Sequence, residues 1–193
     1  MKRGATKEDI IRATQELITR NGIRAVRVDE IVQTLGISKR TLYEMFADKN
    51  DLVNACLDYM SHQQQQRIAA CRRRRGGNSL QKMLKLMNEY IDNLNRVDHT
   101  FLADIRRKVV FAEHYDEHRE FWHKELTDDL ERCRQEQLLL QDIDAASFAD
   151  KLMNTLLDLR LNNTTHDELA LFCRTILRGA ATRQGIELID RKR

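Results

Sequence analysis

Residues 27–46, RVDEIVQTLGISKRTLYEMF, contain two short helical patterns joined by a glycine. The first pattern covers about residues 28–35, and its apolar residues recur at the spacing of one helix face. Gly36 then breaks the chain, and Ser38 is placed to cap a second helix near residues 39–46. Leu42, Met45 and Phe46 share the inward face of that helix, because they lie at positions i, i+3 and i+4. This arrangement predicts a helix-turn-helix, whose second helix is built to enter a DNA major groove.

The polar side chains of the same stretch are left facing outward. Lys39 and Arg40 lie in the first turn of the second helix, where they can reach base edges, and arginine is the usual bidentate partner of guanine. Thr41 can bond a phosphate or touch a thymine methyl, and Ser38 can meet a phosphate at the helix start. Tyr43 and Lys49 are expected to hold the DNA backbone, which positions the helix. The predicted DNA-binding residues are Arg27, Ser38, Lys39, Arg40, Thr41, Tyr43 and Lys49.

Two other interpretations of these residues remain open from the sequence. The charges can be ordinary surface charges on an amphipathic helix pair, which needs no ligand. Alternatively, a degenerate helix-turn-helix can contact only another protein. The agreement of the turn, the cap and the apolar register favours DNA binding over both.

The rest of the chain extends the helical pattern. The 193 residues include no proline and only seven glycines, which favours long helices over a turn-rich β fold. No alternating apolar and polar run is long enough for a convincing strand. We therefore predict an all-α protein of about nine helices, with an N-terminal three-helix DNA-binding domain and a larger helical domain. The expected helices cover about residues 6–21, 28–35, 39–46, 49–74, 79–95, 99–113, 116–139, 144–161 and 165–183.

Charge and glycine content divide the chain into two parts. Residues 1–75 hold 15 Lys and Arg against 9 Asp and Glu, whereas residues 76–193 hold 18 against 21. The basic N-terminal part suits an anionic partner. Gly76-Gly77 is the clearest linker signal. We predict a DNA-binding domain over residues 1–50, a connecting helix over 51–75, and a regulatory ligand-binding and dimerisation domain over 76–193.

The sequence also indicates where the protein works. No apolar run approaches the roughly 18 residues of a membrane span, and the N-terminus lacks the apolar segment of a secretory signal. The four cysteines have no CxxC spacing, so we expect free thiols. These features predict a cytoplasmic protein with no membrane partner.

Residues 6–52 resemble the DNA-binding domain of the TetR family of bacterial transcriptional regulators. The resemblance begins with Ile10-Ile11-Arg12-Ala13, Glu16-Leu17-Ile18 and Asn21-Gly22-Ile23. It continues with Val28-Asp29-Glu30-Ile31, Leu35-Gly36-Ile37-Ser38, Thr41-Leu42-Tyr43, Phe46, Lys49 and Leu52. It implies a homodimer that binds a palindromic operator, represses transcription and releases the DNA when a small ligand binds.

Several positions depart from the family pattern. Arg27 stands where the family commonly has a capping Ser or Thr, so a cation replaces a cap. Val32 and Met45 replace a common small residue and a common His, respectively. Arg40 stands near a frequent glycine and adds a long cation to the recognition surface. The operator sequence therefore cannot be carried over from relatives, and Arg40 is the best candidate for this protein's own specificity.

Two apolar stripes near the C-terminus predict a dimer interface, because such a helix pair can pack against its two-fold copy. The alternative is that both stripes are buried within one subunit. The predicted interface residues are Phe148, Leu152, Leu156, Leu159, Leu169, Phe172, Cys173, Ile176, Leu177 and Ala180.

A small apolar or amphipathic ligand is expected in a pocket formed by the fifth to eighth helices. Methionine and aromatic side chains suit an adaptable pocket, although each of them can equally be plain core. The predicted lining residues are Met83, Met87, Tyr90, Phe101, Ile105, Phe111, Trp122 and Met153.

An enzymatic alternative rests on His114 and His118, whose i, i+4 spacing can hold a divalent metal. The segment around them is charged throughout, so a solvated helix face explains it without a metal. The sequence contains no HExxH, GxSxG or phosphate-loop pattern. We therefore predict a protein that is not an enzyme and has neither a catalytic site, a cofactor nor a bound metal.

Overall fold

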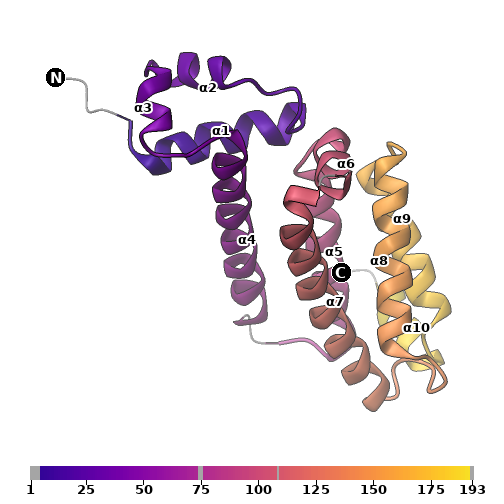
Figure 1. The fold of residues 1–193 in the computed structure, drawn as a ribbon. Coiled ribbons are helices and arrows are strands. Elements are labelled where there is room, and N and C mark those ends of the chain that lie inside the picture. The colour runs from indigo at the N-terminus through magenta and orange to yellow at the C-terminus, as the bar shows by residue number, and fades with distance from the viewer. Residues whose placement is uncertain (1–4, 74–75, 108, 192–193) are drawn as a thin grey trace. The chain divides into compact units, whose positions relative to one another are not determined.

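The computed structural model describes residues 5–73, 76–107 and 109–191, which form an assembly of helices (Figure 1). The helices of the N-terminal half are α1 (Lys7–Asn21), α2 (Val28–Leu35), α3 (Lys39–Tyr43), α4 (Lys49–Arg73) and α5 (Ser79–Asn95). They are followed by α6 (His99–Arg107), the 3-10 helix η1 (Val109–Phe111), α7 (Ala112–Gln135), α8 (Ala145–Leu161), α9 (His166–Gly179) and α10 (Arg183–Asp190). Within these ranges, the one β-type pairing is an isolated bridge between Leu139 and Ala181. The predicted all-α class is confirmed.

The last expected helix, over about residues 165–183, ends at Gly179 in the structure, and a further helix, α10, follows it. The chain leaves the helix after Gly179, and the backbone N–H of Thr182 donates to Leu138 O over 3.0 Å. Thr182 then caps α10 by accepting a hydrogen bond from the N–H of Gly185. Gly185 fits there because a Cβ would lie 2.1 Å from the Leu138 carbonyl oxygen. The expected end near residue 183 was therefore wrong and α10 was not predicted, because the Thr182 N–H bonds the Leu138 carbonyl oxygen instead of continuing α9.

Three other expected elements differ at their ends. Helix α3 stops at Tyr43, and residues 44–45 continue as a turn. The sixth expected helix ends at Arg107 and is followed by η1, so α7 begins at Ala112. Helix α4 is described up to Arg73, and the predicted end of the connecting helix at residues 74–75 lies outside the described residues. Within the described ranges, no helix is both long and apolar enough to cross a bilayer.

The helices fall into two compact units that do not follow chain order. The first unit contains the chain up to Gln65 together with Arg96–Glu117. The second contains Gln66–Asn95 and the chain from His118 onward. Helices α4 and α7 each contribute residues to both units, and α6 belongs wholly to the first.

The first unit is organised around one apolar cluster. Side chains from α1, α2, α3 and α4 meet there with residues from the 96–117 segment, so the late segment completes the core of the helix-turn-helix. The buried members are Ile10, Ile18, Ile23, Val26, Ile31, Val32, Leu42, Phe46, Leu52, Val53, Cys56, Leu57, Val97, Phe101 and Phe111.

The second unit buries the apolar faces of α5, the later part of α7, α8, α9 and α10. Each of these faces repeats at helical spacing, which is why the sequence predicts them as helices. Fully buried members include Leu80, Met83, Leu130, Leu156, Leu169 and Leu177.

Candidate DNA-binding surface

The turn between α2 and α3 has the geometry expected of a helix-turn-helix. Gly36 ends α2 in the left-handed conformation, with φ at 63°. The N–H of Ile37 donates to Val32 O over 3.0 Å, which closes the helix end. Ile31 and Leu42 are completely buried, so they fix the two helices against the core.

Helix α3 is anchored by its inward face. Leu42 is buried completely and Phe46 is 2% exposed, whereas Tyr43 between them is 48% exposed. The Lys7 ammonium lies 5.0 Å from the centre of the Phe46 ring, a cation–π distance. Because α3 has only five residues, tertiary packing rather than helix propensity keeps it formed.

Ser38 and Thr41 are coupled to each other at the start of α3. The Ser38 hydroxyl oxygen accepts the backbone N–H of Thr41 at 3.1 Å, as the predicted cap requires. The two hydroxyl oxygens lie 2.9 Å apart. The hydroxyls that were expected to meet DNA are therefore held in a defined arrangement by the cap.

The two cations of α3 are exposed and paired with acids. Lys39 Nζ lies 2.7 Å from Asp29 Oδ1, and the Lys39 side chain is 52% exposed. The hydrogen bond and the charge of Asp29 raise the pKa of Lys39. Arg40 Nε lies 3.0 Å from Glu44 Oε1, and the Arg40 side chain is 89% exposed. Exposed pairs of this kind contribute little to stability, so both cations can exchange their partner for a phosphate or a base at small cost.

Lys49 has a different environment from the one expected for a backbone contact. Its ammonium donates to the carbonyl oxygens of Ile23, at 2.7 Å, and Val26. These carbonyls belong to the loop between α1 and α2, and Lys49 is half-buried. Arg27 follows the same loop as the N-cap residue of α2; it is exposed and makes no side-chain cap bond. The structure therefore brings Lys49 to the loop that leads to Arg27, and a phosphate contact of Lys49 stays a prediction.

Asp104 of α6 contacts the same loop, and it was not singled out in the sequence. Its side chain is buried, and Oδ2 accepts the backbone N–H of Arg24 at 2.9 Å. No local pattern identifies this residue, because its partner is 80 positions away in the chain.

The predicted ligand-pocket residues are divided between the two units. Phe101, Ile105 and Phe111 pack in or against the core of the first unit. In the second unit, the Tyr90 and Trp122 rings meet edge to face with centroids 5.1 Å apart. Tyr90 also donates from its hydroxyl to Met153 O at 3.4 Å. These three, with Met83 and Met87, are buried.

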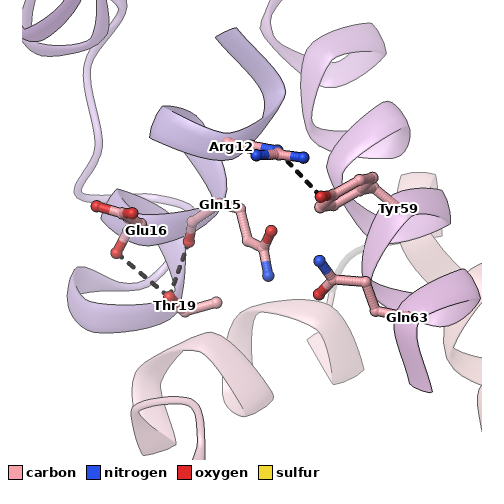
Figure 2. A pocket seen from close by; sticks show the side chains of 6 residues that line it. All are labelled: Arg12, Gln15, Glu16, Thr19, Tyr59 and Gln63. Atoms are coloured by element: carbon pink, nitrogen blue, oxygen red, sulfur yellow. Dashed lines mark hydrogen bonds between the residues drawn. The ribbon is translucent and has the colours of Figure 1, made fainter. Parts of the chain in front are cut away.

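A polar hollow of about 410 Å³ lies between α1 and α4 in the first unit (Figure 2). Arg12 donates to the Tyr59 hydroxyl at 3.1 Å on one side, and the amide groups of Gln15 and Gln63 point toward the open space (Figure 2). None of the eight predicted pocket residues lines this hollow. Its lining residues are Arg12, Gln15, Glu16, Thr19, Tyr59 and Gln63.

Many of the predicted dimer-interface residues are already buried by contacts within the subunit. Six of the ten are buried in the subunit: Leu152, Leu156, Leu169, Cys173, Leu177 and Ala180. Phe148, Leu159 and Phe172 are half-buried, and Ile176 is 37% exposed. Leu171, which the sequence did not single out, is 66% exposed. Fewer apolar residues of the two stripes are therefore accessible to a second subunit than the sequence predicted.

The histidines and cysteines have ordinary structural surroundings. Trp122 donates its indole N–H to His118 Nε2 at 3.3 Å, and burial lowers the pKa of His118 to about 4. Burial also raises the pKa of the Cys56, Cys133 and Cys173 thiols to about 12, which leaves them as unreactive thiols near neutral pH. Within the described residues, no three His, Cys, Asp or Glu side chains are grouped to hold a metal ion.

Known proteins resemble this chain at two levels: in the sequence of the helix-turn-helix region and in the fold of the whole chain. Residues 10–56 match the model of the bacterial regulatory proteins of the tetR family. Over 51 residues, the chain is 41% identical to an uncharacterized HTH-type transcriptional regulator of Mycobacterium tuberculosis, covering 26% of this chain. The match covers only 21% of that relative, about a fifth of its length.

Solved structures share the fold over nearly the full chain. One is a protein from Saccharomonospora viridis assigned as a transcriptional regulator and solved in complex with choline. Its TM-score is 0.79 at 17% identity, over 92% of this chain and 98% of that one. A TetR-family regulator from Agrobacterium tumefaciens has a TM-score of 0.75 at 19% identity, over 91% of this chain and 97% of that one. Residues 10–56 therefore match the TetR-family model, and the chain as a whole shares its fold with these solved regulators.

Proposed function

We propose that the protein is a sequence-specific DNA-binding transcriptional regulator that represses its target genes. The observation that carries the proposal is the separation of side chains on α3 and the turn that follows it. Leu42 and Phe46 are buried in the domain, whereas Lys39, Arg40 and Tyr43 are exposed beside them. A helix that is fixed on one face and offers cations and a phenol on the other suits insertion into a major groove.

The proposed division of labour follows from the contacts. Arg40 contacts base edges and contributes most of the specificity, because its ion pair with Glu44 is exposed and easily exchanged. Lys39 and Thr41 contribute further base or phosphate contacts. Tyr43, Ser38 and Arg27 hold the phosphate backbone. For Lys49, the bonds to Ile23 O and Val26 O support an indirect role, in which it holds the loop that precedes Arg27.

We further propose that the protein acts as a homodimer on a palindromic operator. A single α3 covers one half-site, and two half-sites about 34 Å apart need two subunits. The exposed and half-buried apolar residues Phe148, Leu159, Leu171, Phe172 and Ile176 on α8 and α9 support an interface there. In this proposal residues 1–50 bind DNA, the helix over 51–75 connects, and residues 76–193 dimerise and bind the ligand in a cytoplasmic protein.

Release by a small apolar or amphipathic ligand completes the proposal. The similar protein from Saccharomonospora viridis was solved with choline, a small cation with an apolar exterior. In this chain Trp122 lies among other aromatic rings, with Tyr90 at 5.1 Å and Phe121 at 6.0 Å between centroids. Tryptophan is the preferred partner for such cations, so a quaternary ammonium compound is the first ligand to test.

Electrophoretic mobility shifts on the DNA upstream of the protein's own gene test the proposal. We expect a saturable complex on specific DNA, two subunits per operator, and release of DNA when a quaternary ammonium ligand is titrated in. Arg40→Ala is expected to relax the base preference, at about 1–3 kcal/mol of discrimination, whereas Tyr43→Ala weakens all sequences alike. A wild-type protein with no sequence preference, here or in a genomic selection, would contradict the proposal. An equal loss on specific and random DNA for both variants would contradict the assigned roles.

A further inference from the structure

The loop between α1 and α2, residues 22–27, is held by charged side chains from two distant helices. Lys49 of α4 donates to the carbonyl oxygens of Ile23 and Val26. Asp104 of α6 accepts the N–H of Arg24 at 2.9 Å. Because these partners are backbone groups, the bonds fix the path of the loop whatever side chains it carries.

Helix α6 and the residue before it contact the end of α1 and the loop. The N–H of Asp98, just before α6, donates to Thr19 O at 2.7 Å. Asp104 is 8% exposed and binds Arg24 N–H, and its other oxygen lies 4.0 Å from Arg24 Nε. Between these contacts Gly22 has φ at 81°, and a Cβ there would lie 2.8 Å from Thr100 Oγ1. The contact between α6 and the loop is therefore close enough to require glycine.

The loop leads directly into the DNA-binding surface. Arg27 ends it as the N-cap residue of α2, and Ile31 on α2 is fully buried in the core cluster that also contains Leu42 of α3. A shift of the loop therefore moves the start of α2 and, through the packed core, the base-contacting side of α3. In the chain, α6 lies between α5 and the later part of α7, which both belong to the second unit.

We propose that Asp104 is a positioning residue for DNA binding: by holding Arg24 N–H, α6 sets the position of the α1–α2 loop and hence of the recognition helix. This inference rests on the proposed DNA-binding function. It assigns to α6 a direct contact with the loop that precedes the helix-turn-helix.

The decisive comparison is between Asp104→Ala and Asp104→Asn. The alanine variant leaves Arg24 N–H without its acceptor, whereas asparagine keeps a side-chain oxygen at the same position. We expect Asp104→Ala to bind about tenfold more weakly than wild type to the duplex that wild type selects from a random-sequence library. Asp104→Asn is expected to stay within about twofold. The dependence of log affinity on log salt should keep its slope in both, since no phosphate contact is removed.

Hydrogen exchange tests the bond between Asp104 and the Arg24 N–H, here called the Asp104 clamp, in the absence of DNA. The Arg24 amide should exchange at least about tenfold faster in Asp104→Ala than in wild type, and near the wild-type rate in Asp104→Asn. Arg24→Ala is the matched control, because it removes the 4.0 Å side-chain pair and keeps the N–H that Asp104 binds. Its amide should stay protected.

Two results would overturn the inference. One is an Asp104→Ala protein that melts at a lower temperature but binds the selected duplex as wild type does well below that temperature, which indicates a purely structural role. The other is equal weakening by alanine and asparagine, which excludes the hydrogen-bond acceptor as the cause. If the wild-type protein selects no duplex, the proposed function fails, and the exchange rate of the Arg24 amide still decides whether the clamp exists.

Discussion

Ion pairs at two places in the molecule differ in burial, and they therefore differ in how much they contribute to stability and how easily their partners can be exchanged. On the recognition surface, Lys39–Asp29 and Arg40–Glu44 have more than half of every side chain exposed. Near the end of α4, Arg72 contacts Glu125 and also lies 3.0 Å from Asp129 Oδ1, and the Asp129 side chain is 2% exposed. Exposed pairs are nearly neutral for stability, whereas removing one partner of a buried pair leaves an uncompensated charge.

Under the proposed function, this difference assigns the same residue types two different roles. Pairs that are to be exchanged for DNA have to be weak in the free protein, because every bond lost on binding is subtracted from affinity. In the pair that attaches α4 to α7, the Asp129 carboxylate is shielded from water, whereas the Arg72 side chain is 31% exposed. Arg132 also lies 3.1 Å from Asp129. Lys49, which binds carbonyl oxygens of the α1–α2 loop, is intermediate in exposure between these two kinds of pair, because its side chain is half-buried.

The largest effect is expected for Arg72→Met. Methionine preserves much of the stem but leaves Asp129 with only Arg132, so the free energy of unfolding should fall by roughly 3 kcal/mol. Urea denaturation followed by circular dichroism measures the loss. Arg132→Met is the control, because the Arg132 side chain is 54% exposed and Arg72 remains on Asp129; its loss should be below about 1 kcal/mol. Equal losses for both variants would show that burial does not separate the two contacts.

Lys49→Met should have an intermediate effect. The ammonium that binds Ile23 O and Val26 O is lost, while the aliphatic stem is kept. Loss of hydrogen bonds from a charged donor should lower the free energy of unfolding by about 2 kcal/mol and the melting temperature by roughly 4–8 °C. Calorimetry of Lys39→Met under the same conditions provides the comparison, and that variant should melt within about 2 °C of wild type. The reverse ranking would place Lys49 among the exchangeable cations.

Local patterns were sufficient to predict the helix-turn-helix. Gly36, the Ser38 cap and the inward Leu42 and Phe46 all involve neighbours within a few residues, and the structure contains each of them. The pair of Arg40 with Glu44 could also have been predicted, because the two residues have i, i+4 spacing at the C-terminal end of α3. Features that depend on short sequence separation are visible in one sequence.

The contacts that hold this domain in place were not predictable in the same way. Asp104 and Arg24 are 80 residues apart, and Lys49 and Ile23 are 26 apart, so neither pairing has a local pattern. For the apolar stripes on α8 and α9, the local pattern was visible but the burial of each residue was not predictable from it. Leu152 and Leu177 are buried inside the subunit and Ile176 is exposed, although all have the same helical spacing. Periodicity identifies an apolar face, but the element that covers it depends on the tertiary fold.

The smallest effect is expected for Asp29→Asn, which tests whether the recognition-surface pairs really are exchangeable. Removing the acid frees Lys39 before DNA arrives and takes a negative charge away from the surface, so the operator should bind about two- to fivefold more tightly. Mobility-shift titration at two salt concentrations measures this change in operator affinity. Glu44→Gln should act in the same direction through Arg40, which makes it the matched variant. Weaker binding by Asp29→Asn alone would instead show that the carboxylate accepts a hydrogen bond from a base, since cytosine offers such a donor in the major groove. In that outcome Asp29, rather than Lys39, would contribute to sequence recognition at the start of α2.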